Sequence, residues 1–497
     1  MNTFNDPPQL ACYIDGRWRG GRGELLNTKS PVDGSTLWSA HEADSTDVAE
    51  ALIAARSAQP GWERMPLPQR QAILERFAAT IDADPSALAT VISEETGKPR
   101  WEADTEAAAV VGKVALSIEA HAERTADQSV GATGSLTHRA VGVMGVLGPF
   151  NFPAHLANGQ IVPALLAGNT VVYKPSELTP KVAAAHVRLL NDAGLPPGVL
   201  NLVIGGREAG QALVDGDVDA IAFTGSAETG RAIHSALAGR PNVLLALEMG
   251  GNNPLVVADI PDLDAVVNIL VRSAFITAGQ RCTCARRIYV PNNESGDLLV
   301  DTFVSATERL RMGGPDADPE PFLGPVINEA AAERVRAHAR ELMEVGARRL
   351  TEPDAEGSGA FVRPTIIDAT GVDVPDHEIF GPIVTIHRYD DLDSAFAAAA
   401  DTHYGLAAGL VSSNPADFDR FQRVLRAGVI NLNCPTTGAS GRLPFGGVGA
   451  SGNYRPAGYA AADFCAYPVA RMAYTDPADA VAPIRGMTGG SDGESTS

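Results

Sequence analysis

The residues from 140 to 247 alternate short apolar runs with helix-length stretches, and this alternation constrains the fold more than any other feature of the sequence. Glycine or proline marks most of the turns between the two kinds of segment. Strands that alternate with helices in this way form right-handed βαβ units, and such units build a parallel sheet. We therefore expect an α/β fold with a Rossmann-like parallel sheet. The predicted strands are 140–147, 170–174, 199–204, 218–223 and 243–247.

A second α/β series begins at residue 255 and continues to about residue 433. At 497 residues the chain is longer than one core normally supports, so this series is expected to form a separate lobe. The tail from residue 480 has no apolar period and is expected to be disordered. The second series contains predicted helices at 264–278, 296–312 and 328–345, and predicted strands at 255–258, 287–290, 383–388, 406–411 and 429–433.

The charge and cysteine content limit the possible partners and the compartment. There are 39 Lys plus Arg against 60 Asp plus Glu, giving a net charge of −21, which disfavours nucleic acid and anionic membranes. An anionic substrate would therefore need a local cationic pocket. The start of the chain does not resemble a signal peptide, and its five scattered cysteines indicate a reducing, cytoplasmic environment. The Cys282-Thr283-Cys284 spacing is not that of a zinc site, so no metal is expected.

Cys282 and Glu248 are the strongest candidates for catalysis. Cys282 follows Gly279, Gln280 and Arg281, a polar and cationic setting that favours a nucleophilic thiolate over a small core residue. Glu248 lies at the end of a predicted buried strand, where parallel sheets place their ligands, and two glycines follow it. A general base is the preferred interpretation of Glu248, and a salt bridge at a domain junction is the alternative.

Two further segments have features of a dinucleotide site. A glycine turn between a predicted strand and a helix, at 223–230, could hold a pyrophosphate at the helix N-terminus, although it is not a full Gly-x-Gly-x-x-Gly motif. Lys174 and Glu177 follow another strand. A carboxylate at that place can bind a ribose diol and would repel a 2′-phosphate, but a solvated Lys–Glu pair fits the spacing equally well.

From about residue 12 to about residue 475 the chain resembles the aldehyde dehydrogenase family. The resemblance rests on marker segments that occur in the family's order. They are residues 149–153, 174–177, 223–226, 247–251, 279–282, 378–382 and 444–447.

The resemblance implies a fold and an assembly. It implies an NAD-binding domain (1–122 and 140–247), an α/β catalytic domain (248–440) and a small strand element for oligomerisation (123–139 and 462–478). A homodimer or a homotetramer is expected. NAD is the implied cofactor.

The resemblance also implies roles for individual residues. Cys282 would be the nucleophile and Glu248 the general base, and the Asn151 amide with the Cys282 N–H would form the oxyanion hole. The implied cofactor-binding residues are Lys174, Glu177, Gly225, Ser226, Ala227, Glu228, Thr229, Gly230, Glu378 and Phe380.

Residues 95–103, 252–254, 282–287 and 449–453 further resemble those of bacterial family members that oxidise N-succinylglutamate 5-semialdehyde in arginine catabolism. That substrate carries two carboxylates, so Arg281 and His155 are the expected cationic contacts and Phe445 a further substrate residue. A structural salt bridge is the alternative for each cation. Alternative functions are the oxidation of another anionic semialdehyde such as succinate semialdehyde, a coenzyme A-acylating reductase, and a catalytically idle structural relative.

Overall fold

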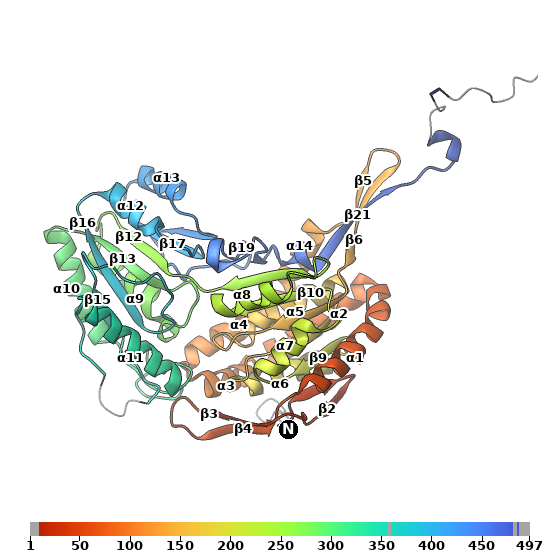
Figure 1. Cartoon of the computed structure of the whole chain (residues 1–497), viewed down its shortest axis with the longest axis horizontal. Helices are drawn as coiled ribbons and strands as arrows, with labels where there is room; N and C mark the ends of the chain where they lie inside the picture. Colours follow the sequence, from red (N-terminus) through yellow and green to blue (C-terminus); the bar gives the residue numbers. More distant parts are fainter. Residues whose placement is uncertain (1–8, 355–358, 481–484, 487–497) are drawn as a thin grey trace, which may run out of the picture.

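The computed structural model describes residues 9–354, 359–480 and 485–486, and its first large sheet is mainly parallel (Figure 1). The strand order is β11-β10-β7-β8-β9-β1-β2, and only the pairings of β1, with β9 and with β2, are antiparallel. The predicted parallel sheet is therefore confirmed. Its strands are β7 (Val143–Leu147), β8 (Thr170–Lys174), β9 (Leu200–Val203), β10 (Ala220–Gly225), β11 (Leu244–Met249), β1 (Cys12–Ile14) and β2 (Arg17–Arg19).

Helices pack against this sheet and bury its central strands. Every residue of β7 and β8 is buried, as expected for a parallel sheet that is covered on both faces. The connecting helices are α5 (His155–Ala167), α6 (Pro180–Asp192), α7 (Arg207–Asp215) and α8 (Ala227–Ala236). The preceding helices are α1 (Ser45–Arg64), α2 (Leu67–Ala83), α3 (Pro85–Thr96) and α4 (Arg100–Arg124).

A second sheet has the order β14-β15-β16-β13-β12-β17-β18, and only β14 is antiparallel. The predicted second α/β series is therefore present, although β15 was not foreseen from its short apolar run. Its strands are β12 (Asn253–Val257), β13 (Ala285–Pro291), β14 (Arg348–Arg349), β15 (Thr365–Asp368), β16 (Ile383–Tyr389), β17 (Ala407–Val411) and β18 (Val429–Leu432). Its helices are α9 (Leu263–Phe275), α10 (Glu294–Glu308), α11 (Glu329–Glu344), α12 (Leu392–Ala400) and α13 (Pro415–Val424).

A three-stranded antiparallel sheet projects from the body of the molecule (Figure 1). It joins β5 (Gln128–Val130) and β6 (Gly134–Ala140) to β21 (Ala466–Met472) near the other end of the chain. The predicted strand 140–147 was wrong in one respect. It contains the end of β6 and all of β7, separated at Gly142, whose φ of 137° breaks the extended backbone.

The smaller elements complete the described structure. They are the hairpin of β3 (Leu25–Lys29) and β4 (Thr36–His41), the pair β19 (Pro444–Phe445) and β20 (Ala457–Gly458), and α14 (Ala461–Cys465). The division into domains stays a prediction. The tail predicted to be disordered lies outside the described residues, apart from residues 480, 485 and 486.

The strand order reverses at β7, and this reversal places the candidate site. The chain runs from β7 to β8 and β9 on one side, and then returns to β10 and β11 on the other side of β7. Ligands of open α/β sheets bind at such a switch point, beyond the carboxyl ends of the strands. Asn151 lies in the loop after β7, Ser226 follows β10, and Glu248 lies at the end of β11.

Candidate active site

The loop that carries Cys282 has an unusual backbone. Thr277, Ala278 and Gly279 have φ values of 56°, 51° and 68°, so three successive residues are left-handed. The predicted helix 264–278 therefore ends earlier, at Phe275. A Cβ on Gly279 would lie 2.0 Å from the Gly381 carbonyl oxygen, so only glycine fits this contact. Because non-glycine residues rarely adopt this conformation, the surrounding hydrogen bonds must hold the loop in place.

Asn253, on β12, is a positioning residue that the sequence analysis did not identify. Its Nδ2 donates to the carbonyl oxygens of Cys282 (2.7 Å) and Cys284 (2.8 Å), and its Oδ1 accepts from the Ala407 N–H (2.9 Å). One side chain thus joins the nucleophile loop to the second sheet. The sequence signal was present, because Asn253 follows the two glycines after Glu248, but its partners are distant in the sequence.

Arg286, on β13, is a buried cation whose charge acts on the Cys282 thiol. The pKa of the thiol is raised by burial and by the carboxylates of Glu378 and Glu248, and the Arg286 charge opposes that shift. The expectation that Arg281 supplies a thiolate-favouring charge stays a prediction. Arg281 turns instead to the buried Glu102, at 3.1 Å, and to the Thr277 hydroxyl, at 2.8 Å. The thiol is consequently protonated at neutral pH and needs a base before it can attack.

Glu248 is a buried carboxyl group with one satisfied oxygen. Its Oε1 accepts from the Ala457 N–H at 3.2 Å, whereas Oε2 has no hydrogen-bond partner. Burial raises its pKa to about 8, and the Ala457 hydrogen bond only partly opposes this. A carboxyl group whose pKa is close to the working pH can accept a proton and release it again, as a general base must.

Asn151 lies directly against the Cys282 loop. One N–H of its side-chain amide donates to the Gln280 carbonyl at 2.8 Å. The backbone carbonyl of Asn151 accepts a hydrogen bond from the Lys98 ammonium at 2.8 Å. Lys98 also forms a buried salt bridge with Glu106 at 2.7 Å. These contacts fix the loop after β7 beside the nucleophile, which is where an oxyanion-hole amide would have to be.

The predicted cofactor residues fall into three groups. Two groups follow β8 and β10 of the first sheet, and the third, Glu378 with Phe380, belongs to the second α/β series. Lys174 and Glu177 pair with each other at 3.4 Å beyond β8. Ser226 caps α8 by accepting from the Thr229 N–H at 3.2 Å, so the glycine turn does lead into a helix N-terminus. The predicted pyrophosphate-binding residues run from the end of β10 into the first turns of α8; they are Gly225, Ser226, Ala227, Glu228, Thr229 and Gly230.

Glu378 reaches across to the segment after Glu248. A Cβ on Gly250 would lie 1.7 Å from Glu378 Oε2, so any larger residue there would displace the Glu378 carboxylate. Arg286 lies 3.7 Å from Glu378 Oε1 and donates to the Gly381 carbonyl at 3.0 Å. The Phe380 ring meets the Phe150 ring edge-on, with centroids 5.8 Å apart. The 378–380 segment is thus packed against both the nucleophile loop and the loop after β7.

The three predicted substrate residues, His155, Phe445 and Arg281, have different surroundings. His155 begins α5, and burial lowers its pKa to about 4, so it is neutral rather than cationic at pH 7. Phe445 lies in β19, paired with Ala457, whose N–H binds Glu248. Arg281 is in a salt bridge, which was the alternative that the sequence left open.

Lys113, on α4, is a buried cation that the sequence analysis missed. Its ammonium donates to the Gly458 carbonyl at 2.9 Å, and within the described part of the chain it has no carboxylate partner within salt-bridge distance. It contributes to the lowered pKa of His155, so the two groups are close neighbours. Gly458 follows Ala457, so Lys113 binds the residue next to the one that binds the general base.

None of the helices that the structure describes combines the length and the apolar composition needed to cross a membrane.

Comparisons with known proteins identify similar sequences and structures. Residues 18–468 match the model of the aldehyde dehydrogenase family. N-succinylglutamate 5-semialdehyde dehydrogenase of Serratia proteamaculans is 52% identical over 468 residues, which cover 93% of this chain and 96% of the relative. The Escherichia coli K12 protein of the same name is 48% identical over 469 residues, covering 93% of this chain and 95% of the relative.

Solved structures show the same architecture. Betaine aldehyde dehydrogenase of Staphylococcus aureus, in complex with NAD+, superposes with a TM-score of 0.89 at 26% identity and covers 95% of this chain and 96% of its own. Lactaldehyde dehydrogenase of Escherichia coli has a TM-score of 0.87 at 31% identity and covers 94% of this chain and 99% of its own.

Proposed function

The chain belongs to the aldehyde dehydrogenase family, and from this premise we propose that it oxidises N-succinylglutamate 5-semialdehyde to N-succinylglutamate in arginine catabolism, with NAD as the hydride acceptor. Relatives about half identical to it carry the corresponding name. The observation that carries the proposal is the convergence of Asn151 and Glu248 on the Cys282 loop.

The first half of the reaction forms a bond to Cys282. The thiol is protonated, so its proton must pass to solvent as sulfur attacks the aldehyde carbon, which leaves Glu248 able to take a proton in the second half. The aldehyde oxygen becomes negative, and we assign its stabilisation to the free N–H of the Asn151 amide and the Cys282 backbone N–H. The product is a thiohemiacetal on sulfur. NAD supplies the hydride acceptor that turns this adduct into a thioester.

In the second half, water cleaves the thioester. Glu248 Oε2 has no hydrogen-bond partner among the residues that the structure describes, and it can accept a proton from that water. Hydroxide adds to the acyl carbon, the carbon–sulfur bond breaks, and the proton held by Glu248 returns to the Cys282 sulfur. The carboxylate product leaves, and both residues regain their starting protonation states.

The residues present fit a nicotinamide dinucleotide. Glycine at 225 and the N-terminus of α8 can hold a pyrophosphate. Glu378 is buried, and its Oε1 has no hydrogen-bond partner, so a ribose hydroxyl could satisfy it. We assign Lys174 and Glu177 to the adenosine ribose, and Glu378 with Phe380 to the nicotinamide ribose.

We propose NAD rather than NADP because of Glu177, and the Glu177→Gln variant tests this. The carboxylate can bind both ribose hydroxyls and would repel a 2′-phosphate. The wild type should therefore have a higher kcat/KM with NAD than with NADP. The Glu177→Gln variant should lower the ratio of these two kcat/KM values by roughly tenfold or more. Steady-state rates with both cofactors measure it. A wild-type enzyme that uses both equally well would contradict the assignment.

We further propose that Lys113 binds a carboxylate of the substrate, with His155 as a neutral hydrogen-bond donor and Arg281 as a secondary cation. The Arg281 charge is already compensated by Glu102, whereas the Lys113 ammonium contacts the Gly458 carbonyl and forms no salt bridge with a described residue. Burial lowers the pKa of Lys113 to about 8, so most of it still carries a charge at pH 7. An anionic ligand would offset the cost of that buried charge.

The Lys113→Met variant should lose specificity for charged substrates. Removing one charge-assisted hydrogen bond costs about 1.5–3 kcal/mol, or roughly ten- to a hundredfold in kcat/KM for N-succinylglutamate 5-semialdehyde. An uncharged aldehyde such as hexanal should be affected much less. Because methionine fits the same space without a buried charge, the thermal midpoint should stay near that of the wild type.

The Arg281→Leu variant is the matched comparison for Lys113→Met. Loss of the Arg281 contacts to Thr277 and Glu102 should reduce turnover of both aldehydes, because these contacts hold the nucleophile loop. Since Arg281 is only the secondary cation, the charged aldehyde should lose only slightly more than the uncharged one. If Arg281→Leu impairs only the charged substrate while Lys113→Met impairs neither, Arg281 is the substrate cation and the Lys113 assignment is wrong.

The proposed activity is tested by following NADH absorbance with a panel of aldehydes. N-succinylglutamate 5-semialdehyde should have the highest kcat/KM, ahead of succinate semialdehyde and of uncharged aldehydes. A higher kcat/KM for succinate semialdehyde would favour the alternative function, the oxidation of another anionic semialdehyde.

We propose that the three-stranded sheet of β5, β6 and β21 mediates homo-oligomer formation, as a dimer or a tetramer. Val130, Tyr467 and Met472 are large apolar side chains on this sheet, and they are 62%, 44% and 67% exposed. A patch of this kind on a projecting element is typical of an interface. The double variant Val130→Asp with Met472→Asp should shift the mass measured by light scattering to a smaller species. A monomeric wild type, or an unchanged mass in the variant, would contradict the proposal.

A further inference from the structure

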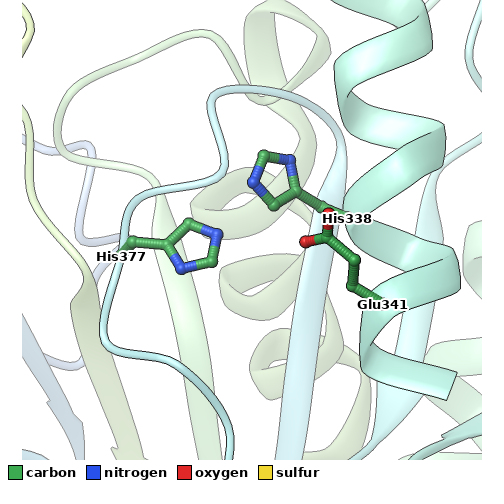
Figure 2. A group of neighbouring side chains, drawn as sticks. All are labelled: His338, Glu341 and His377. Carbon is green, nitrogen blue, oxygen red and sulfur yellow. The ribbon is translucent and has the colours of Figure 1, made fainter. Parts of the chain in front are cut away.

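Three side chains with metal-binding atoms meet between α11 and the segment that leads to Glu378. His338 and Glu341 lie one turn apart on α11, and His377 directly precedes Glu378. One ligand atom of each lies within 4.8 Å of the others. Figure 2 shows the two imidazole rings and the carboxylate turned toward one another. None of the three has a role in the active site described above.

The hydrogen bond of His338 determines which of its nitrogens is available. Its Nδ1 lies 2.8 Å from the Arg334 carbonyl oxygen. Because a carbonyl oxygen can only accept, Nδ1 carries the hydrogen and Nε2 keeps its lone pair. Metal-bound histidines usually donate their other N–H in this way, which orients the ring and makes the ligating nitrogen more basic.

His377 and Glu341 supply the other two ligand groups. Nε2 of His377 is buried and has no hydrogen-bond partner in the described part of the chain, an arrangement that costs free energy unless a ligand satisfies it. Burial and the neighbouring His338 lower the pKa of His377, so its ring is neutral at physiological pH. The Glu341 carboxylate is exposed, and it makes no salt bridge among the residues that the structure describes.

We propose that His338, Glu341 and His377 form a binding site for Zn2+ or a similar divalent transition-metal ion. Two imidazole nitrogens and one carboxylate oxygen suit zinc, with water in the fourth position. Mg2+ and Ca2+ prefer oxygen ligands and do not fit this set. Zinc–ligand bonds of about 2.0–2.2 Å place ligand atoms roughly 3.5 Å apart, so small side-chain rotations would complete the site.

The ion would tie α11 to the 375–381 segment. Gly381 already packs against this helix, since a Cβ there would lie 2.3 Å from Val335 Cγ2. An ion that binds the folded protein and not the unfolded chain raises the free energy of unfolding. Zinc should therefore raise the thermal midpoint, in addition to binding with a defined stoichiometry.

Calorimetric titration of the full-length protein with zinc chloride tests the proposal. The Cys282→Ala background is used because the nucleophilic thiol could itself bind zinc. One ion per chain should bind, and adding His338→Ala or Glu341→Gln should weaken that binding by roughly 10- to 100-fold or more. The rise in thermal midpoint should disappear in the same variants.

His41 provides a matched control. It is exposed, and its Nδ1 also contacts a backbone carbonyl, that of Gly23 at 2.9 Å. His41→Ala in the Cys282→Ala background should bind zinc as the parent does. The proposal is overturned if the parent binds no zinc in a saturable manner, or if His338→Ala and Glu341→Gln bind it as tightly as the His41→Ala control.

Discussion

The Cys282→Ala variant should lose aldehyde oxidation almost completely, with residual turnover below about 1% of the wild type. Without sulfur there is no thiohemiacetal and no thioester, so hydride transfer has no covalent adduct to start from. NAD binding should persist, because the cofactor residues that we assign lie on β8, β10, α8 and the 378–380 segment. NADH production and NAD titration by protein fluorescence measure the two effects.

The Cys434→Ala variant is the matched control for loss of a thiol. Cys434 is half-buried in the loop after β18 and has no place in the proposed mechanism. It should retain most of the wild-type turnover. Substantial turnover in Cys282→Ala, or equal losses in the two variants, would remove Cys282 from the role of nucleophile.

Replacing Glu248 with Gln should separate the two halves of the reaction. Glutamine keeps the size of the side chain and can still accept the Ala457 N–H, but it cannot take a proton from water. We expect a burst of NADH followed by steady turnover slowed about a hundredfold or more. Rapid-mixing absorbance measures both phases. A normal steady rate without a burst would assign Glu248 to structure.

The wild-type hydrolytic step should also depend on pH in a defined direction. Burial raises the pKa of Glu248 to about 8, and only the deprotonated carboxylate accepts a proton. Single-turnover thioester hydrolysis should therefore rise with pH up to about 8 and then level off. This dependence should be absent from Glu248→Gln. A rate that falls as pH rises through this range would contradict the role of Glu248 as base.

The sheet and the order of the main elements could be predicted because they depend on periodic patterns. The strand predicted at 170–174 matches β8, and the buried apolar runs mark the other parallel strands within a few residues. The family resemblance and the α/β fold were confirmed. The substrate residues and the general base stay predictions until they are tested on this chain.

Side-chain directions in the irregular loops could not be predicted in the same way. Arg281 is adjacent to Cys282 in the sequence, yet the left-handed backbone before it turns its guanidinium toward Glu102. Arg286, further along on β13, is the cation whose charge opposes the raised pKa of the thiol. Proximity in sequence is a poor guide to electrostatic proximity once the backbone leaves a regular element.

Asn253 and Lys113 were missed for a related reason. Asn253 donates hydrogen bonds to carbonyl oxygens of the Cys282 loop, which is distant in the sequence. Lys113, on α4, donates to the carbonyl of Gly458, which lies near the other end of the chain. The local pattern around Lys113 does not distinguish it from a solvated polar side chain, and the glycines before Asn253 do not reveal its distant partners. Both become apparent only from their burial and hydrogen bonds in the folded chain.

Peptide mass spectrometry of the trapped acyl-enzyme tests the central claim most directly. Glu248→Gln protein is mixed with NAD and N-succinylglutamate 5-semialdehyde, quenched in acid during the burst, and digested. We expect the peptide that contains Cys282 to gain the mass of one N-succinylglutamyl acyl group, in proportion to the NADH formed. A full burst of NADH with Cys282 unmodified, or with the acyl group on another residue, would contradict covalent catalysis by Cys282.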